Sequence, residues 1–188
     1  TYRLRHIVLF FVIASPVCAQ LAQNWSLAFS SASHAIGVNP LNRSIVYIYN
    51  TSDSKFYVSY DYGLSWIPRG ILNAGGDIRN ITVNPLDTNV VIAVGFGIFK
   101  SNDGGKTWRE ALANVTIDGE SIDYNYLHPD TMYFVDFSMR KFYLSADTGS
   151  SWVERSTVGF GPICTVVSHP QNLNIIIIGS GDTRIERS

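Results

Sequence analysis

Short apolar segments separated by turn residues recur along this chain with a period of a little over forty residues. In each period a strand-like segment ends at a proline, and a continuous apolar run follows it. The segments that end at proline are residues 35–40, 80–85, 123–129 and 165–170, and the apolar runs are residues 45–49, 90–94, 132–135 and 175–178. Proline cannot donate to a strand ladder, and a short run apolar at every position is typical of a strand buried on both faces. The pattern therefore predicts β-strands, and we find no amphipathic helical period after residue 20.

A polar motif follows each of the first three apolar runs. Its three copies occupy residues 59–66, 101–108 and 145–152 and share the pattern S-x-D-x-G-x-[ST]-W. The tryptophans Trp66, Trp108 and Trp152 lie 42 and 44 residues apart. A period of this length, with strand-like sequence between the copies, predicts one four-stranded propeller blade per repeat.

Each residue type in the motif has a local physical role. The aspartate accepts hydrogen bonds from backbone N–H groups of a turn, the glycine permits a positive φ, and the tryptophan contributes a large apolar face. A catalytic site needs different groups in one place, whereas these groups recur identically, so we predict a structural role. The predicted structural residues are Ser59, Asp61, Gly63, Trp66, Ser101, Asp103, Gly105, Trp108, Ser145, Asp147, Gly149 and Trp152.

The motif resembles the Asp-box (BNR) repeat, and the resemblance covers about residues 36–188. It implies an all-β fold, a β-propeller, with the box in the turn between the third and fourth strands of each blade. We expect blades at approximately residues 35–72, 78–114 and 121–158 and a truncated fourth at 163–188. Three blades and an incomplete fourth would form an open arc, which predicts a fragment of a longer protein. Proteins with this repeat include sialidases, xyloglucanase-type glycoside hydrolases, sortilin-type receptors and photosystem assembly factors.

The N-terminus has the layout of a secretory signal peptide. Arg3 and Arg5 precede an apolar run at residues 7–14, and small residues lead to Ala19. This order predicts a signal peptide at residues 1–19 and a partial propeller at 20–188, with a buried first strand as the alternative. N-x-[ST] sequons predict N-glycosylation at Asn24, Asn42, Asn50 and Asn114, whereas Asn80 opens an inner strand and is the least expected site. We therefore expect an extracellular or endomembrane-lumenal protein.

The net charge and the spacing of the Cys and His residues restrict the classes of partner and cofactor that we expect. The net charge is −1 and no Lys/Arg cluster occurs, which argues against nucleic acid or an acidic membrane as a partner. The apolar run at residues 7–14 is too short for a membrane span. No Cys/His cluster has zinc spacing, so we expect no metal and no cofactor, and Cys164 would be either buried or paired elsewhere. His128 and His169 are interpreted as turn residues that take the place of Asn39 and Asn84 before the proline.

A hydrolase remains the alternative to a binding protein. Glycoside hydrolysis needs two carboxyl groups facing each other across a cleft. The carboxylates outside the boxes that we considered are Asp53, Asp77, Asp87, Asp118, Glu120, Asp123, Asp130 and Asp136. Asp53 lies where xyloglucanase-type enzymes carry a catalytic aspartate in an R-T-D-x-G-G segment, although the arginine and both glycines are absent here. The early Arg-Ile-Pro motif of sialidases is also missing, which makes that class the weaker hydrolase alternative.

Two segments favour the sortilin-type receptors. Residues 56–63 and 142–149 resemble the Y-[VL]-S-x-D-[FY]-G run of those propellers. In such receptors an extended peptide enters the central tunnel and can add to an exposed strand edge. We therefore expect a binding module for a peptide, protein or carbohydrate ligand, and we lean against an enzyme.

Overall fold

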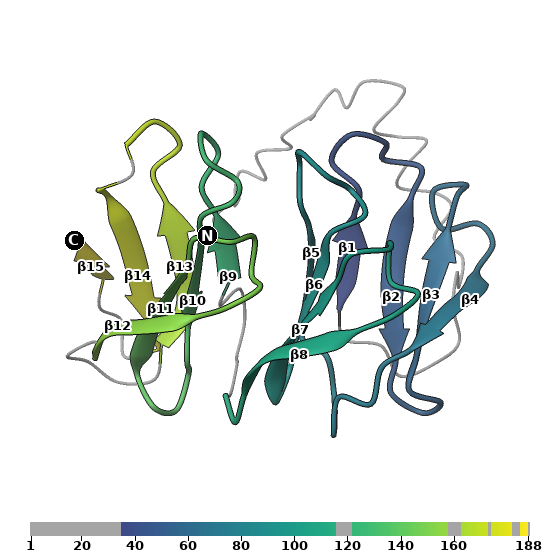
Figure 1. The fold of residues 1–188 in the computed structure, drawn as a ribbon, viewed down its shortest axis with the longest axis horizontal. Coiled ribbons are helices and arrows are strands. Elements are labelled where there is room, and N and C mark those ends of the chain that lie inside the picture. The colour runs from purple at the N-terminus through teal and green to yellow at the C-terminus, as the bar shows by residue number, and fades with distance from the viewer. Residues whose placement is uncertain (1–34, 116–121, 158–162, 173, 182–184, 188) are drawn as a thin grey trace, which may run out of the picture.

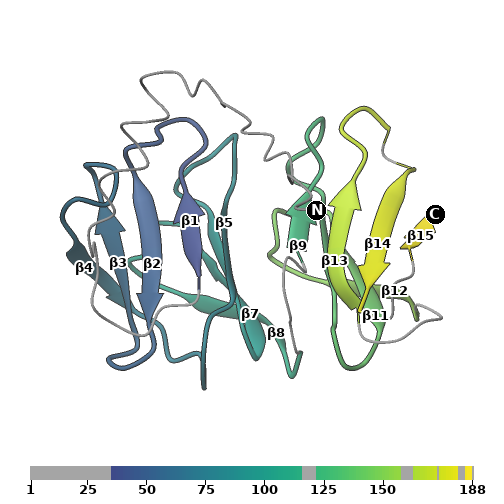
Figure 2. The ribbon, with the colours of Figure 1, turned by 180° about the vertical axis from the view of Figure 1, so that it is seen from behind.

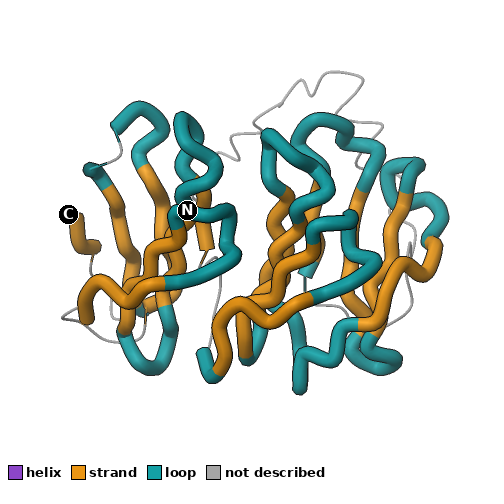
Figure 3. Tube along the Cα trace, in the orientation of Figure 1, coloured by secondary structure: helices purple, strands orange, loops and turns teal. Residues whose placement is uncertain are grey.

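The fold consists of β-strands arranged in four antiparallel sheets (Figures 1 and 3). The structure is a computed structural model that describes residues 35–115, 122–157, 163–172, 174–181 and 185–187. Every regular element within these residues is a strand, and none is a helix that could cross a membrane. The predicted signal peptide and Asn24 lie outside the described residues.

Strand order within each sheet follows the order in the sequence. The first sheet contains β1 (Ile36–Val38), β2 (Val46–Asn50), β3 (Lys55–Ser59) and β4 (Ile67–Ile71). The second contains β5 (Asn80–Val83), β6 (Val91–Val94), β7 (Gly97–Ser101) and β8 (Arg109–Ala113). The third contains β9 (Ile122–Tyr124), β10 (Met132–Val135), β11 (Lys141–Ser145) and β12 (Val153–Thr157). The fourth contains β13 (Ile163–Ser168), β14 (Ile176–Ser180) and β15 (Ile185–Arg187).

The four sheets stand side by side in an open arc, as Figures 1 and 2 show from opposite sides. This arrangement confirms the predicted fold class of three four-stranded blades and an incomplete fourth. The repeat extends to local irregularities. The pairing between the third and fourth strands shifts register at Phe56/Tyr57, at Ile98/Phe99 and at Phe142/Tyr143. A bulge thus recurs at an equivalent place in each of the three complete blades and is a feature of the repeat.

The hydrophobic core lies between neighbouring sheets. Strand β6 shows why its sequence is apolar at every position. Val91 and Ala93 belong to the cluster shared with the first sheet, whereas Ile92 and Val94 belong to the cluster shared with the third. Both faces of this strand are thus removed from water, which no alternating polar pattern would permit. A third cluster, which includes Val135 and Val166, joins the third and fourth sheets.

Polar side chains also link consecutive sheets. Arg69 Nε donates to the carbonyl of Gly104 at 3.1 Å, and Asn84 Nδ2 donates to the carbonyl of Pro129 at 2.9 Å. Lys100 is only 5% exposed, and its Nζ donates to Ser150 Oγ at 2.8 Å. Burial lowers the pKa of Lys100 from its ordinary value. A buried cation with hydrogen-bond partners is tolerated, because leaving it without a partner would cost several kcal/mol.

The turns between first and second strands correct one prediction about the histidines. Asn39, Asn84 and Asn125 each accept backbone N–H bonds from the residues two and three positions later. His169 occupies the same place and accepts from Gln171 N. His128 does not, because its carbonyl accepts from Thr131 N, as the carbonyl of Asn42 does from Ile45 N. The predicted equivalence of His128 with Asn39 is therefore wrong, since Asn125 takes that place and the proline of the third repeat comes three residues later than in the first two.

Each sheet has two ends, which differ in the turns they carry. We call the end with the β2–β3, β6–β7 and β10–β11 turns the hairpin end, and it forms the lower edge of Figure 1. The opposite end carries the motif turns 59–66, 101–108 and 145–152 and is called the box end. There, the motif turn of each sheet is tied to the turn before the second strand by backbone hydrogen bonds, such as Tyr62 N to the carbonyl of Ser44 at 3.0 Å.

Candidate functional site

The three motif turns share one hydrogen-bond network. In the second turn, Ser101 Oγ donates to Asp103 Oδ1 at 2.8 Å and accepts from Gly105 N at 2.8 Å. Thr107 donates its N–H to Oδ1 at 2.9 Å and its hydroxyl to Oδ2 at 2.6 Å. The same contacts recur around Asp61 and Asp147. Both oxygens of each carboxylate accept hydrogen bonds from within its own turn.

These hydrogen bonds stabilise the ionised carboxylates. Hydrogen bonds from the Ser65 hydroxyl and N–H lower the pKa of Asp61 from 3.8 to about 2. Burial would raise the pKa of Asp103, but the hydrogen bonds from Thr107, Ser101 and Lys106 outweigh it and bring the value to about 2. The pKa of Asp147 is lowered in the same way against the effect of burial. A carboxylate with so low a pKa is a poor proton carrier at neutral pH.

In the second and third motifs, the glycine and the tryptophan lie against the preceding sheet. Gly63, Gly105 and Gly149 all have positive φ, as the sequence predicted. The ring of Trp108 lies 4.3 Å from that of Phe56 in the first sheet, centroid to centroid. Trp152 packs in the cluster shared by the second and third sheets. The second and third motifs thus lie at the seams between sheets.

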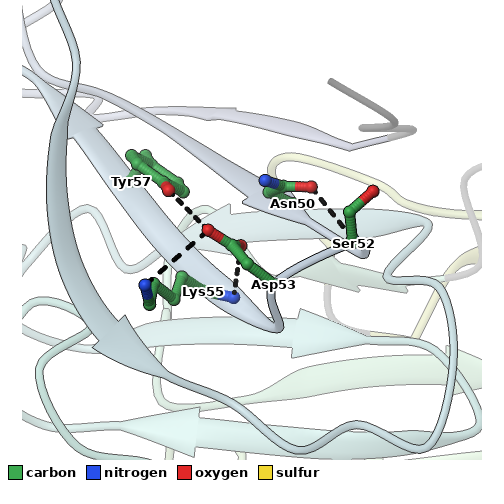
Figure 4. A network of polar contacts seen from close by, with 5 residues as sticks. All are labelled: Asn50, Ser52, Asp53, Lys55 and Tyr57. Atoms are coloured by element: carbon green, nitrogen blue, oxygen red, sulfur yellow. Dashed lines mark hydrogen bonds and ion pairs between the residues drawn. The ribbon is translucent and has the colours of Figure 1, made fainter. Parts of the chain in front are cut away.

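Asp53 lies in the β2–β3 turn at the hairpin end of the first sheet (Figure 4). The Tyr57 hydroxyl donates to Asp53 Oδ2 at 2.6 Å, and Lys55 N donates to Oδ1 at 3.2 Å. Lys55 Nζ is 3.9 Å from Oδ2, and the Asp53 side chain is 32% exposed. The hydrogen bond to Asp53 raises the pKa of Tyr57. This arrangement holds one oriented carboxylate that solvent can reach.

A second carboxylate, that of Asp77, is hydrogen-bonded to a residue of the same turn. Asp77, in the β4–β5 connection, accepts from Thr51 Oγ1 at 2.8 Å. Asp136, in the corresponding turn of the third sheet, is buried and accepts from Ser138 N and Met139 N. Asp136 therefore organises its own turn. Asp53 and Asp77 are the candidate acids of the first sheet outside its motif turn. Asp118 and Glu120 lie outside the described residues.

A cavity of about 300 Å³ opens between the first strands of the second, third and fourth sheets. Its polar lining comes from Asn80 and Thr82 of β5, Asp123 of β9 and Tyr126, and its apolar lining includes Val167 of β13. Asp123 Oδ2 accepts both the N–H and the hydroxyl of Ser168 at 2.8 Å, which fixes this carboxylate between the third and fourth sheets. The ring of Tyr126 packs 5.2 Å from that of Tyr124 and is mostly exposed.

This cavity is open and more polar than apolar, and it brings side chains of three first strands to one place. Sequence reasoning considered Asp123 only as one of several carboxylates and missed Asn80, Thr82 and Tyr126 as its neighbours. The available signal was a set of polar residues within otherwise apolar first strands. These strands are more than forty residues apart in the sequence, and only the arc brings them together around one cavity.

The other predicted site residues lie apart from this cavity. Asn42 and Asn114 are exposed on turns, whereas Asn50 at the end of β2 is 8% exposed. Cys164 lies within β13. Among the residues that the structure describes, no group of three or more His, Cys, Asp or Glu side chains is placed to hold a metal ion.

Two comparisons of the sequence place it among known proteins. The Sortilin-Vps10 family model, described as sortilin, neurotensin receptor 3, matches residues 54–158. A xyloglucanase of Hypocrea jecorina (strain QM6a) is 30% identical over 124 residues, which are 61% of this chain. The chain spans only 14% of the length of that enzyme.

Solved structures share the fold at low sequence identity. An ancestral GH74 enzyme superposes with a TM-score of 0.70 and 17% identity, over 85% of this chain and 23% of that enzyme. The GH74 xyloglucanase from Xanthomonas campestris gives a TM-score of 0.61 and 16% identity, over 80% and 27%. YCF48 bound to D1 peptide gives 0.55 and 15%, over 84% and 55%. At these identities the likeness establishes the propeller-type architecture and nothing about the chemistry.

Proposed function

Because this chain belongs to the Sortilin-Vps10 family, we propose that it forms part of a propeller that binds a peptide or protein ligand. The observation that supports this proposal best is the cavity between β5, β9 and β13, with its oriented carboxylate and apolar wall. YCF48, a structural neighbour, was solved with a peptide bound. A propeller of this architecture is therefore compatible with a peptide ligand.

The lining favours a particular ligand chemistry. Among the described lining residues, Asp123 is the only Asp or Glu, and none is Lys or Arg. Asn80 and the Tyr126 hydroxyl add neutral polar groups. An extended segment that carries a Lys or Arg side chain can bind Asp123, and its apolar neighbours can contact Val167.

Binding to an array of extended synthetic peptides tests this proposal. The full-length protein should retain peptides with a basic residue, and Asp123→Asn should weaken the best of them by about 1.5–3 kcal/mol, roughly ten- to a hundredfold. Asp53→Asn, at the hairpin end of another sheet, serves as the matched control and should bind normally. Equal weakening by both variants, or no peptide above background, would contradict the proposal.

The second candidate is a glycoside hydrolase of the xyloglucanase type. The 30% identity to a xyloglucanase and the exposed, oriented Asp53 favour it. In this interpretation Asp53 acts as acid or base, and Tyr57 keeps its carboxylate oriented. Assays of the full-length protein on xyloglucan, other β-glucans and sialosides decide between the two functions. Turnover that is lost in Asp53→Ala and retained in Asp123→Asn would establish the hydrolase.

We also propose that the protein enters the secretory pathway. The order of basic, apolar and small residues before Ala19 supports this localisation. Expression of the full-length protein in eukaryotic cells, followed by protease protection of sealed microsomes, measures it directly. Protection without detergent and digestion with detergent is the expected result.

A further inference from the structure

We infer that the folded protein carries N-linked glycans at Asn42 and Asn114 and none at Asn50 or Asn80, although all four asparagines stand in N-x-[ST] sequons. This inference rests on the proposed entry into the secretory pathway. In the modification, Nδ2 of the asparagine attacks C1 of a sugar carried on a lipid pyrophosphate. The C1–O bond breaks, the lipid pyrophosphate leaves, and the amide nitrogen loses one proton. The product keeps a bulky polar group on Nδ2, so the folded chain must leave room for it.

Asn42 meets this requirement in the turn between β1 and β2. Its side chain is exposed, and its Oδ1 accepts both the N–H and the hydroxyl of Ser44, at 3.2 Å and 2.7 Å. Ser44 is the hydroxyl residue of the same sequon. The two contacts engage the oxygen of the amide and leave Nδ2, the atom that bonds the sugar, on the other side of the carboxamide group.

Asn114 meets the requirement at the end of the outermost strand of the second sheet. It follows β8, it is exposed, and it has a φ of 55°. Asparagine is one of the few residues that adopt this left-handed conformation readily. The next residue, Val115, is 2% exposed and packs in the core between the second and third sheets. The buried valine anchors the backbone while the asparagine before it remains at the surface.

Asn50 and Asn80 fail the same requirement for different reasons. Asn50 closes β2 opposite Lys55, is 8% exposed, and accepts from Ser52 N at 2.9 Å (Figure 4). A glycan on its Nδ2 would have to displace the buried end of the strand. Asn80 is half-buried in β5, is paired with Val94, and lines the cavity described above. A glycan there would fill the proposed ligand site.

Site-resolved mass spectrometry tests this assignment on the full-length protein purified from eukaryotic secretory cells. Release of glycans by an amidase in ¹⁸O-water converts each modified asparagine to an ¹⁸O-labelled aspartate. We expect the label at positions 42 and 114 and unmodified asparagine at positions 50 and 80. A label at position 50 or 80, or its absence from position 42 or 114, would overturn the inference.

Single substitutions give an independent readout. Asn42→Gln and Asn114→Gln should each remove one step of electrophoretic mobility, and Asn50→Gln and Asn80→Gln should remove none. Ser44→Ala should match Asn42→Gln, whereas the neighbouring Arg43→Ala should leave the mobility unchanged. If the protein is secreted without a glycan at Asn42 and Asn114, this inference fails. The proposed peptide binding at the cavity would be unaffected by that result. If both sites are modified and no peptide binds, the inference stands and the proposed ligand is wrong.

Discussion

At the residue scale, the motif aspartates show how one side chain can fix a turn. Asp103 accepts from Ser101 Oγ, Lys106 N, Thr107 N and Thr107 Oγ1, so one carboxylate organises most of the turn. Sequence chemistry predicted the acceptor role of the aspartate. The sequence did not show that the serine at the start of the motif is a second centre of the hydrogen-bond network. Ser101 Oγ accepts from Gly105 N while it donates to Asp103.

We expect Asp103→Ala to lower the free energy of unfolding by about 1–3 kcal/mol, because backbone donors of the turn lose their acceptor. Denaturant unfolding followed by fluorescence measures the change. Asn102→Ala, one position earlier and exposed, is the matched control and should stay within about 0.5 kcal/mol of wild type. An Asp103→Ala variant as stable as this control would refute the structural role.

The low pKa of the motif aspartates predicts a loss of stability in acid. The pKa of Asp61 and of Asp103 is about 2 in the folded protein, below the ordinary value of 3.8. Their stabilising contribution is therefore complete above about pH 4 and is lost as the pH falls towards 2. Thermal melting between pH 6 and pH 2 should show a falling Tm, with a shallower fall in Asp103→Asn. Parallel curves for the variant and the wild type would contradict this linkage.

At the element scale, the burial of a strand depends on its position in the sheet. The second strands β2, β6 and β10 are buried along their whole length, whereas the outermost strand β12 is exposed at every residue. The apolar runs predicted the former well. The fourth strands have little periodicity because most of their residues face water, so the sequence located them mainly by the tryptophan that precedes each one.

Trp108 connects two sheets, and its loss should be costly. Truncation to alanine removes the contact with Phe56 and leaves a cavity at the seam, which we expect to cost about 3–5 kcal/mol. Trp108→Phe retains an aromatic ring there and should lose less. Equilibrium unfolding of both variants gives the comparison, and equal losses would argue against a packing role for the indole.

Gly149 and Gly75 provide a matched pair that tests how closely the third motif turn packs against the second sheet. Both have positive φ, but a Cβ on Gly149 would lie 2.8 Å from Ile92 Cδ1 of the second sheet, whereas a Cβ on Gly75 would meet no atom within 4 Å. Both alanine variants share the backbone strain, and only Gly149→Ala adds overpacking. We expect it to be less stable than Gly75→Ala by about 1–3 kcal/mol in chemical denaturation. Equal stabilities would show that the motif turn can move away from the second sheet.

At the scale of the whole molecule, the arc presents apolar side chains on its outer sheets. Val167 and Ile177 are opposite each other in β13 and β14 and are 51% and 41% exposed, and Ile185 of β15 is 76% exposed. Ile36 and Val38 are likewise exposed on β1 of the first sheet. Sheets of repeat proteins bury such faces against a neighbour.

We therefore expect residues 20–188, expressed alone, to self-associate as their concentration rises. Size-exclusion chromatography with light scattering measures the association. Replacing Val167 and Ile177 by threonine should weaken it, because threonine keeps the strand propensity and removes apolar surface. Leu86→Thr, on a turn, is the control and should leave the association unchanged. A monodisperse monomer at all concentrations would show that these faces need no partner.

The sequence by itself determined the repeat, the strands and the chemistry of the motif turns. Those features depend on neighbours within a few positions, such as an aspartate and the N–H groups it accepts from, or on short continuous runs of apolar residues. The resemblance to Asp-box proteins added the propeller architecture, which the four sheets and their neighbours among solved structures confirm.

Only the tertiary structure decided which groups meet across the repeats. Asp123 reaches Ser168, and Asn80, Tyr126 and Val167 share one cavity, because the curvature of the arc brings three first strands together. Asn50, where the sequon predicted a glycan, is only 8% exposed at the end of β2. Such contacts join residues more than twenty-five positions apart, and their geometry depends on how each sheet stacks on the next. No local pattern records that stacking, so the proposed ligand site and the proposed choice among sequons rest on the fold.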